Sequence, residues 1–90
     1  MPFPSSRRLT ELRIQFGRRL RDVREQHGLT QERLGELADV DRKTINRIEN
    51  GMYSPLLDQI FKISDALEVP ARELFPGADV HRERDPASDM

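Results

Sequence analysis

The chain has 90 residues and lacks both cysteine and tryptophan, and its two histidines are His27 and His81. Without cysteine, neither a disulfide framework nor a thiolate metal site can form, which is typical of a reducing cytoplasm. One histidine at a predicted helix end and one in a predicted tail do not supply a metal cage or a catalytic dyad. No glycine-rich phosphate loop and no GxSxG motif is present. We therefore expect no enzymatic activity, no metal and no cofactor.

Long apolar runs are absent as well. No segment approaches the roughly 20 apolar residues that a membrane span requires, and the N-terminus lacks the apolar core of a secretory signal. We therefore expect a cytoplasmic protein that does not bind membranes. A chain of 90 residues builds one small core and leaves little room for a deep substrate cleft. Its size favours a binding module.

The net charge of −1 is unevenly distributed along the chain. Residues 1–51 carry eleven Arg and Lys against eight Asp and Glu, whereas residues 52–90 carry four against eight. The sequence pI of about 6.1 argues against nucleic-acid binding, for which a pI above about 9 is typical. That objection disappears if the basic half presents its charges on one face and the acidic half lies elsewhere.

Apolar residues recur at three- and four-residue spacing, which predicts helices only. The first helix ends near Gly28, which can adopt a left-handed cap conformation. Gly17 is a point where this helix could break, and residues 6–15 either extend it or form a separate arm. Residues 1–5 and 77–90 are predicted to be disordered tails, the second one acidic, which leaves a domain over residues 6–76. The apolar stripe of the first helix consists of Leu9, Leu12, Phe16, Leu20 and Val23.

The next two helices carry matching start signals. Thr30 can cap the free amides of one helix, and Asp41 can cap those of the other, after a turn over residues 39–41. The spacing predicts a helix-turn-helix motif over residues 30–50 with a second helix over residues 41–50. These are the dimensions of a motif that reads DNA.

The rest of the domain is predicted to contain two more helices. Ser54 is the expected cap of a fourth helix, with Pro55 in its first turn. A short fifth helix over residues 71–75 follows, so the prediction is an all-α domain of five helices. The residues of the fourth helix expected to face inward are Leu57, Ile60, Ile63, Ser64 and Leu67.

One face of the helix over residues 41–50 is polar and positively charged, and Ile45 and Ile48 lie on the opposite face. Arg and Lys hydrogen-bond to guanine and Asn to adenine in the major groove, so the composition favours DNA reading over a merely solvated face. At 100° per residue the polar side covers an arc of about 140°, which holds Arg42, Lys43, Asn46, Arg47 and Asn50.

Three stretches of the chain occur together, GLTQERLGELA, TINRIENG, and SP followed by ISDALEVP. With them, residues 16–75 resemble the XRE or Cro/C1-type helix-turn-helix family of bacterial and phage transcriptional regulators. The resemblance implies a lambda-repressor-like domain of five helices that binds double-stranded operator DNA, generally as a homodimer. An isologous dimer would place two reading helices about 34 Å apart, so the operator should be pseudo-palindromic. Restriction-modification controllers, phage repressors, plasmid regulators and antitoxins are all compatible with a single domain of this size that resembles this family.

The resemblance also implies roles by position. Arg24 and Glu49 match a partly buried ion pair that joins the first helix to the reading helix. The family often has glycine where this chain has Asp39 and Glu68, and Glu in a left-handed backbone would cost about 1 kcal/mol. The positions that match base-reading residues are Arg42, Lys43, Arg47, Asn46 and Thr44. The positions that match phosphate contacts are Thr30, Gln31 and Asn50.

A second class of function is a protein-binding module, for instance an antitoxin that masks a toxin and represses its own operon. RNA polymerase would be another protein partner. Four residues are apolar beyond what the inward stripe of the fourth helix requires: Met52, Tyr53, Leu56 and Phe61. They either pack in the core or a loop, form a dimer surface, or bind a foreign partner.

Overall fold

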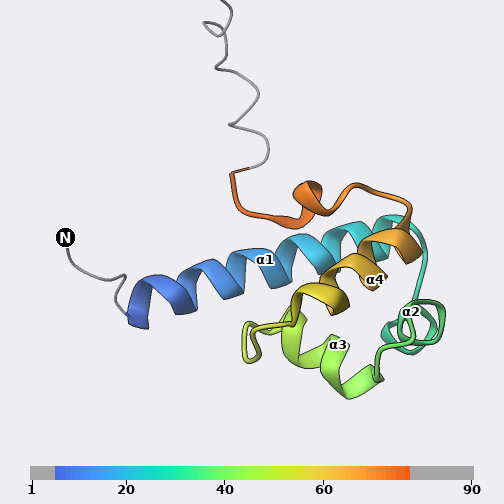
Figure 1. Ribbon diagram of the computed structural model, residues 1–90, viewed down its shortest axis with the longest axis horizontal. Helices are drawn as coiled ribbons and strands as arrows, with labels where there is room; N and C mark the ends of the chain where they lie inside the picture. Colours follow the sequence, from blue (N-terminus) through green and yellow to red (C-terminus); the bar gives the residue numbers. More distant parts are fainter. Residues whose placement is uncertain (1–5, 78–90) are drawn as a thin grey trace, which may run out of the picture.

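A computed structural model of the chain describes residues 6–77 (Figure 1). Four α-helices and a 3-10 helix make up this part of the chain, so the predicted all-α class is confirmed and the fifth helix is a single 3-10 turn. The helices are α1 (Ser6–Gln26), α2 (Gln31–Ala38), α3 (Arg42–Glu49), α4 (Leu57–Leu67) and η1 (Ala71–Leu74). Apart from Gly77, both predicted tails lie outside the described residues. None of the described helices is long and apolar enough to cross a membrane.

Helix α1 is continuous from Ser6 to Gln26, so residues 6–15 extend it and Gly17 does not break it. Gly17 instead allows α1 to approach α3, because a Cβ at this position would overlap the carbonyl oxygens of Ile48 and Glu49. Gly28, with φ of +69°, follows the end of α1 as predicted. The long first helix is therefore fixed against the last turn of α3 by backbone contact.

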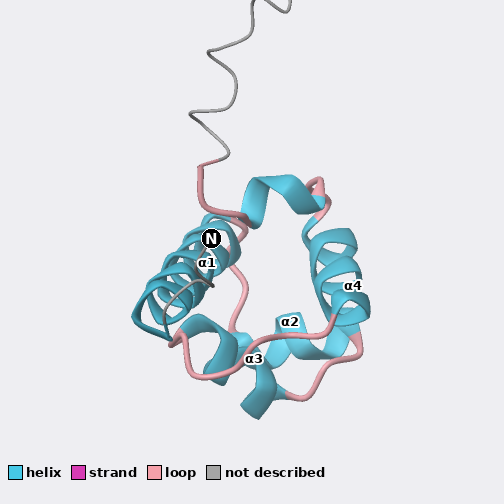
Figure 2. Ribbon diagram, turned by 60° about the vertical axis from the view of Figure 1, so that its left-hand side comes forward, coloured by secondary structure: helices cyan, strands magenta, loops and turns pink. Residues whose placement is uncertain are grey.

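The helices enclose one apolar core. Helices α1 and α4 face each other, α2 and α3 close one end of the core, and η1 lies at the other end (Figure 2). Arg19 ties η1 to α1, since its Nε donates to the carbonyl oxygen of Glu73 at 2.7 Å. Leu9, in the first turns of α1, lies outside the core and is exposed. The core consists of Phe16, Leu20, Val23, Leu34, Ala38, Val40, Ile45, Ile48, Ile60, Ile63, Leu67 and Leu74.

The start of α4 differs from the prediction. Ser54 and Pro55 precede the helix, and Leu56 occupies the cap position. The side-chain oxygen of Gln59 accepts hydrogen bonds from the Leu56 N–H at 2.9 Å and from the Tyr53 hydroxyl at 3.1 Å. These bonds satisfy the helix start in place of Ser54 and hold the preceding segment extended.

The predicted inward face of α4 is correct except for its first residue. Ile60, Ile63, Ser64 and Leu67 are buried as predicted, whereas Leu57 is 60% exposed. Leu57 is the first residue of α4, one turn before Ile60, where the described core ends. The first turn of α4 therefore extends beyond the core, and Leu57 lies on the surface.

Two non-glycine residues adopt the left-handed conformation after a helix. Asp39 caps the C-terminus of α2 with φ of 58°, and Glu68 caps that of α4 with φ of 60°. The geometry that glycine often provides is thus kept in both turns. At Glu68 this geometry costs about 1 kcal/mol because its Cβ crowds the backbone.

Candidate nucleic-acid interface

The two helices of the motif begin at the predicted caps. The Thr30 hydroxyl oxygen accepts from the Arg33 N–H at 2.9 Å, and the Asp41 carboxylate accepts from the Lys43 N–H at 3.0 Å. Ile45 and Ile48 are almost completely buried. Burial of such a side chain contributes roughly 1.5–3 kcal/mol. The apolar side of α3 is therefore anchored in the core and its opposite side faces solvent.

The solvent side of α3 carries the predicted positive charge. Thr44 is partly buried beside it. Seven ion pairs are found between residues 6 and 77, and none of them involves Arg42, Lys43 or Arg47. Three of the eleven cations of residues 1–51 thus lie together on one face, and no ion pair among the described residues compensates their charge. The exposed residues of this face are Arg42, Lys43, Asn46, Arg47 and Asn50.

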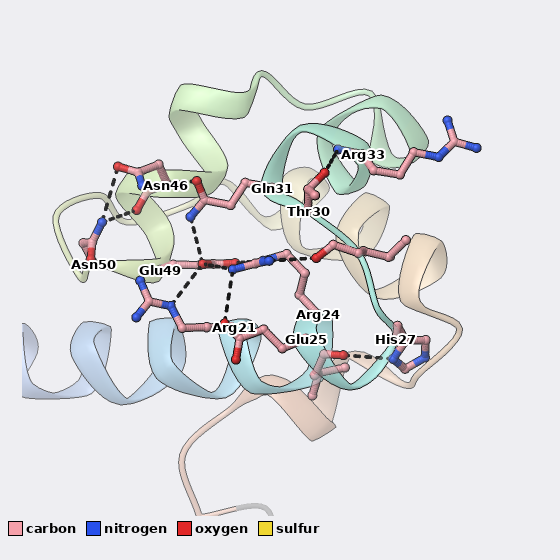
Figure 3. A network of polar contacts seen from close by, with 12 residues as sticks. Arg21, Arg24, Glu25, His27, Thr30, Gln31, Arg33, Asn46, Glu49 and Asn50 are labelled. Carbon is pink, nitrogen blue, oxygen red and sulfur yellow. Dashed lines mark hydrogen bonds and ion pairs between the residues drawn. The ribbon is translucent and has the colours of Figure 1, made fainter.

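Amide side chains connect the exposed face of α3 to the start of α2 (Figure 3). Asn46 Nδ2 donates to Gln31 Oε1 at 3.2 Å. Asn50 Nδ2 donates to the Asn46 carbonyl oxygen at 2.9 Å and to its Oδ1 at 3.3 Å. The structure thereby brings one proposed base-reading residue next to two proposed phosphate contacts.

Beneath these amides lies an ion pair between Arg24 of α1 and Glu49 of α3. Arg24 Nε lies 2.6 Å from Glu49 Oε2, and Arg24 Nη2 lies 2.9 Å from Oε1. Both residues are buried, with exposures of 8% and 4%. Arg24 Nη1 donates to the Leu29 carbonyl oxygen at 2.7 Å, and Gln31 Nε2 donates to Glu49 Oε1 at 2.9 Å. The pair joins α1, the α1–α2 turn, α2 and α3.

The surroundings of this pair keep both partners ionised. Burial alone would raise the pKa of Glu49, but hydrogen bonds from Arg24 and Gln31, the charge of Arg24 and a hydrogen bond from Arg21 together lower it. The hydrogen bond to Glu49 raises the pKa of Arg24, and desolvation opposes this rise. The charged pair is therefore the form present at neutral pH.

Two residues that contact Glu49 were not predicted from the sequence as its partners. Arg21 Nε lies 3.5 Å from Glu49 Oε1, and its side chain is 46% exposed. Gln31, predicted only as a phosphate contact, also bridges Glu49 and Asn46. Arg21 precedes Arg24 by one helical turn, and this spacing places both on one face of α1. That spacing is the signal by which Arg21 could have been found.

Three of the four residues proposed as a dimer surface are exposed: Met52 (75%), Leu56 (63%) and Phe61 (50%). Tyr53 is partly buried against the core. It lines an apolar cavity of about 420 Å³ between α1, residues 53–55, α4 and residues 75–76. Leu57, predicted to face inward, is exposed instead. The exposed apolar residues at the start of α4 are thus Met52, Leu56, Leu57 and Phe61.

Helix α2, the three-residue turn over residues 39–41 and the exposed cationic helix α3 form a helix-turn-helix motif, which packs on the apolar core that α1 and α4 share. The family model described as Helix-turn-helix matches residues 20–74, and the chain belongs to this family, the XRE or Cro/C1 type. The match confirms the resemblance and begins within α1, so residues 6–19 lie before it. The chain is accordingly a DNA-binding transcriptional regulator of this family and not an enzyme.

Individual relatives agree with the family. Control protein C.MunI from Mycoplasma sp is 34% identical over 76 residues, which are 83% of this chain and 100% of that protein. A longer HTH-type protein of Methanocaldococcus jannaschii is 39% identical over 64 residues, 71% of this chain but 19% of that protein. The crystal structure of the restriction-modification controller protein C.AhdI from Aeromonas hydrophila superposes with a TM-score of 0.69 at 40% identity. The superposition covers 70% of this chain and 96% of the C.AhdI chain.

Proposed function

We propose that the chain acts as a cytoplasmic homodimer that binds a pseudo-palindromic operator with α3 in the major groove. The observation that carries this proposal is the two-sided character of α3. Its back is buried through Ile45 and Ile48, while its front presents three cations that have no carboxylate partner among residues 6–77. The major groove of B-DNA admits an α-helix and offers acceptors on guanine to such cations.

The proposed base contacts follow from position along α3. Arg42 and Lys43 lie in its first turn, and residues near the N-terminus of a recognition helix contact base edges. Arg47 lies one turn further on, where its guanidinium can pair with guanine O6 and N7. Asn46, held by its amide neighbours, suits adenine. Thr44, partly buried, is the fifth proposed contact.

The proposed phosphate contacts lie on either side of these residues. Thr30 and Gln31 stand at the start of α2, where unpaired backbone N–H groups favour an anion. The Thr30 hydroxyl oxygen already accepts from Arg33, which leaves its proton free to donate. Asn50 lies at the other end, after α3. Phosphate contacts at both places would fix the register of α3 in the groove.

The proposed dimer uses the exposed apolar residues Met52, Leu56, Leu57 and Phe61, with Tyr53 beneath them. An isologous contact buries the same patch on both copies, which removes four large apolar side chains from water. C.AhdI is a restriction-modification controller protein, and we extend that role to this chain. A two-fold dimer then requires two half-sites centred about one DNA turn apart, about 34 Å.

Selection of bound sequences from a random duplex pool tests this function. The enriched sites should be pseudo-palindromic, and binding should weaken steeply with salt, by a logarithmic slope of about −0.9 for each phosphate neutralised. Arg42→Ala should cost about 1–3 kcal/mol on the selected site and relax base preference locally. Arg72→Ala is the matched control, because Arg72 is exposed on η1, at the end of the core away from α3 (Figure 2).

Two results would contradict the proposal. Equal losses on selected and random duplexes would remove the base-reading role of Arg42. A salt-independent interaction, or failure to enrich any site, would favour a protein partner such as a toxin over DNA.

A further inference from the structure

Arg21 is a cation of α1 whose ion pair leaves most of the guanidinium group unused. Its Nε lies 3.5 Å from Glu49 Oε1, at the limit of a hydrogen bond. Glu49 already accepts shorter bonds, at 2.6 and 2.9 Å from Arg24 and at 2.9 Å from Gln31. Among the described residues, no hydrogen bond involves the terminal nitrogens of Arg21. Its role in holding Glu49 is therefore secondary.

Arg21 is the exposed cation of the cluster around Glu49. Arg21 and Arg24 both pair with Glu49, and Arg24 also lies 3.9 Å from the carboxylate of Glu25, which is exposed. Arg24 is buried and bidentate on Glu49, whereas the Arg21 side chain is 46% exposed. Positive charge is therefore accessible to solvent at Arg21 and not at Arg24.

This accessible charge is connected to the proposed DNA-contacting residues. Arg21 touches Glu49, which accepts from Gln31; Gln31 accepts from Asn46, and Asn46 accepts from Asn50. Figure 3 shows the Arg21 guanidinium at the same end of the network as Asn50. An anion bound by the side-chain amides of Gln31 and Asn50 would therefore be attracted by the positive charge of Arg21.

We propose that Arg21 binds a phosphate of the DNA backbone beside the bases that α3 reads. The planar guanidinium presents paired N–H donors that match phosphate geometry. Contact between Nε and Glu49 restrains the side chain, so less rotamer freedom is lost when the terminal nitrogens bind an anion. Helix α1, which precedes the motif, would then contact the DNA backbone through Arg21, next to the backbone contacts proposed for the start of α2.

This inference rests on the proposed binding of operator DNA and adds one contact to it. A purely structural role for Arg21 is the competing explanation. It is disfavoured because ion pairs that are half exposed contribute little to stability, and because Arg24 already donates to both carboxylate oxygens of Glu49 at 2.6 and 2.9 Å. The two explanations differ in how binding depends on salt, since neutralising a phosphate releases counterions whereas an internal ion pair does not.

The test is Arg21→Gln, measured by fluorescence anisotropy on the selected operator and on a random duplex over a range of salt concentrations. The slope of log K against log salt should become shallower by about 0.9, the value for one phosphate. Affinity should fall by the same factor, about three- to tenfold at moderate salt, on both duplexes, because a phosphate contact carries no base preference. Arg72→Gln removes the same charge from η1 and should leave the slope unchanged.

A second variant separates charge from geometry. Arg21→Lys should restore the salt slope, since it keeps the positive charge, but recover affinity only in part because ammonium lacks the paired donors. Both variants are compared at a temperature well below their melting points, so that unfolding does not enter the binding constant.

The outcomes separate the inference from the function on which it rests. If the wild-type chain binds its operator with a steep salt slope and Arg21→Gln keeps that slope, Arg21 does not contact phosphate and the proposed function stands. The inference is equally overturned if Arg21→Lys fails to restore the slope. If the wild-type chain shows no salt-dependent duplex binding, the proposed function itself fails.

Discussion

The buried pair between Arg24 and Glu49 gives the sharpest prediction about stability. Glu49→Ala removes the acceptor of two Arg24 hydrogen bonds, at 2.6 and 2.9 Å, and leaves a side chain that is only 10% exposed with its longer ion pair to the exposed Glu25, at 3.9 Å. Breaking one side of a buried pair costs about 3–5 kcal/mol. Arg24 keeps its bond to the Leu29 carbonyl oxygen, so the lower end, about 3 kcal/mol, is expected.

That loss is large for a domain of this size. Domains gain roughly 0.05–0.15 kcal/mol of stability per residue, or about 4–11 kcal/mol for the described part. In a domain of 60–100 residues, 1 kcal/mol changes Tm by about 4–8 °C, so Glu49→Ala should lower Tm by at least about 12 °C. Thermal and urea unfolding followed by far-UV circular dichroism measure this, at several protein concentrations because dimerisation also stabilises.

A matched control comes from the other ion pair of α1. Arg19 and Glu73 are partly exposed, and Arg19 Nε is held by the Glu73 backbone carbonyl in any variant. Glu73→Ala should therefore cost less than about 1 kcal/mol. Replacing both Arg24 and Glu49 by Met and Leu should recover much of the loss, because no unpaired charge remains. An unchanged Tm in Glu49→Ala would show that the pair is not buried as described.

Three further predictions concern pH, assembly and backbone strain. The lowered pKa of Glu49 adds stability that is present above the ordinary pKa of a glutamate and is lost as pH falls through the lower folded value. Unfolding of Glu49→Gln should therefore depend less on pH in that acid range, and parallel curves for the two proteins would refute this. Phe61→Glu places a charge in the proposed dimer surface and should give monomers in analytical ultracentrifugation, whereas a dimer that persists would exclude Phe61 from the interface. Glu68→Gly relieves a left-handed backbone and should stabilise the domain by up to about 0.5 kcal/mol, which is the strain of about 1 kcal/mol less the entropy cost of glycine; a lower urea midpoint would contradict it.

Much of the fold could be predicted because its signals are local. Thr30, Asp41 and Gly28 each determine a helix boundary through the backbone of their immediate neighbours, and all three occupy the predicted boundaries. The start of α4 was predicted wrongly because two local signals compete. The Ser54–Pro55 pair is a common helix start, but Gln59 satisfies the N–H of Leu56 and so shifts the boundary.

The candidate site divides in the same way. The exposed arc of α3 follows from helical periodicity. Because Ile45 and Ile48 face the core, the residues on the opposite side of the helix face solvent. The partnership of Arg24 with Glu49 was implied by family resemblance, as spacing along the chain does not reveal it. The contacts of Arg21 and Gln31 depend on how α1 crosses α3 and on side-chain rotamers, and both are properties of the packed tertiary structure.

The close approach of α1 and α3 at Gly17 restricts the sequences that can adopt this fold. In an ordinary helix, replacing glycine by alanine stabilises by about 1 kcal/mol, and larger side chains at a surface are tolerated. At Gly17 the added methyl group would overlap two backbone carbonyls of α3, which no rotamer change can relieve. Tolerance at this position should therefore be all-or-none: in a saturation library, alanine should be rejected as firmly as tryptophan.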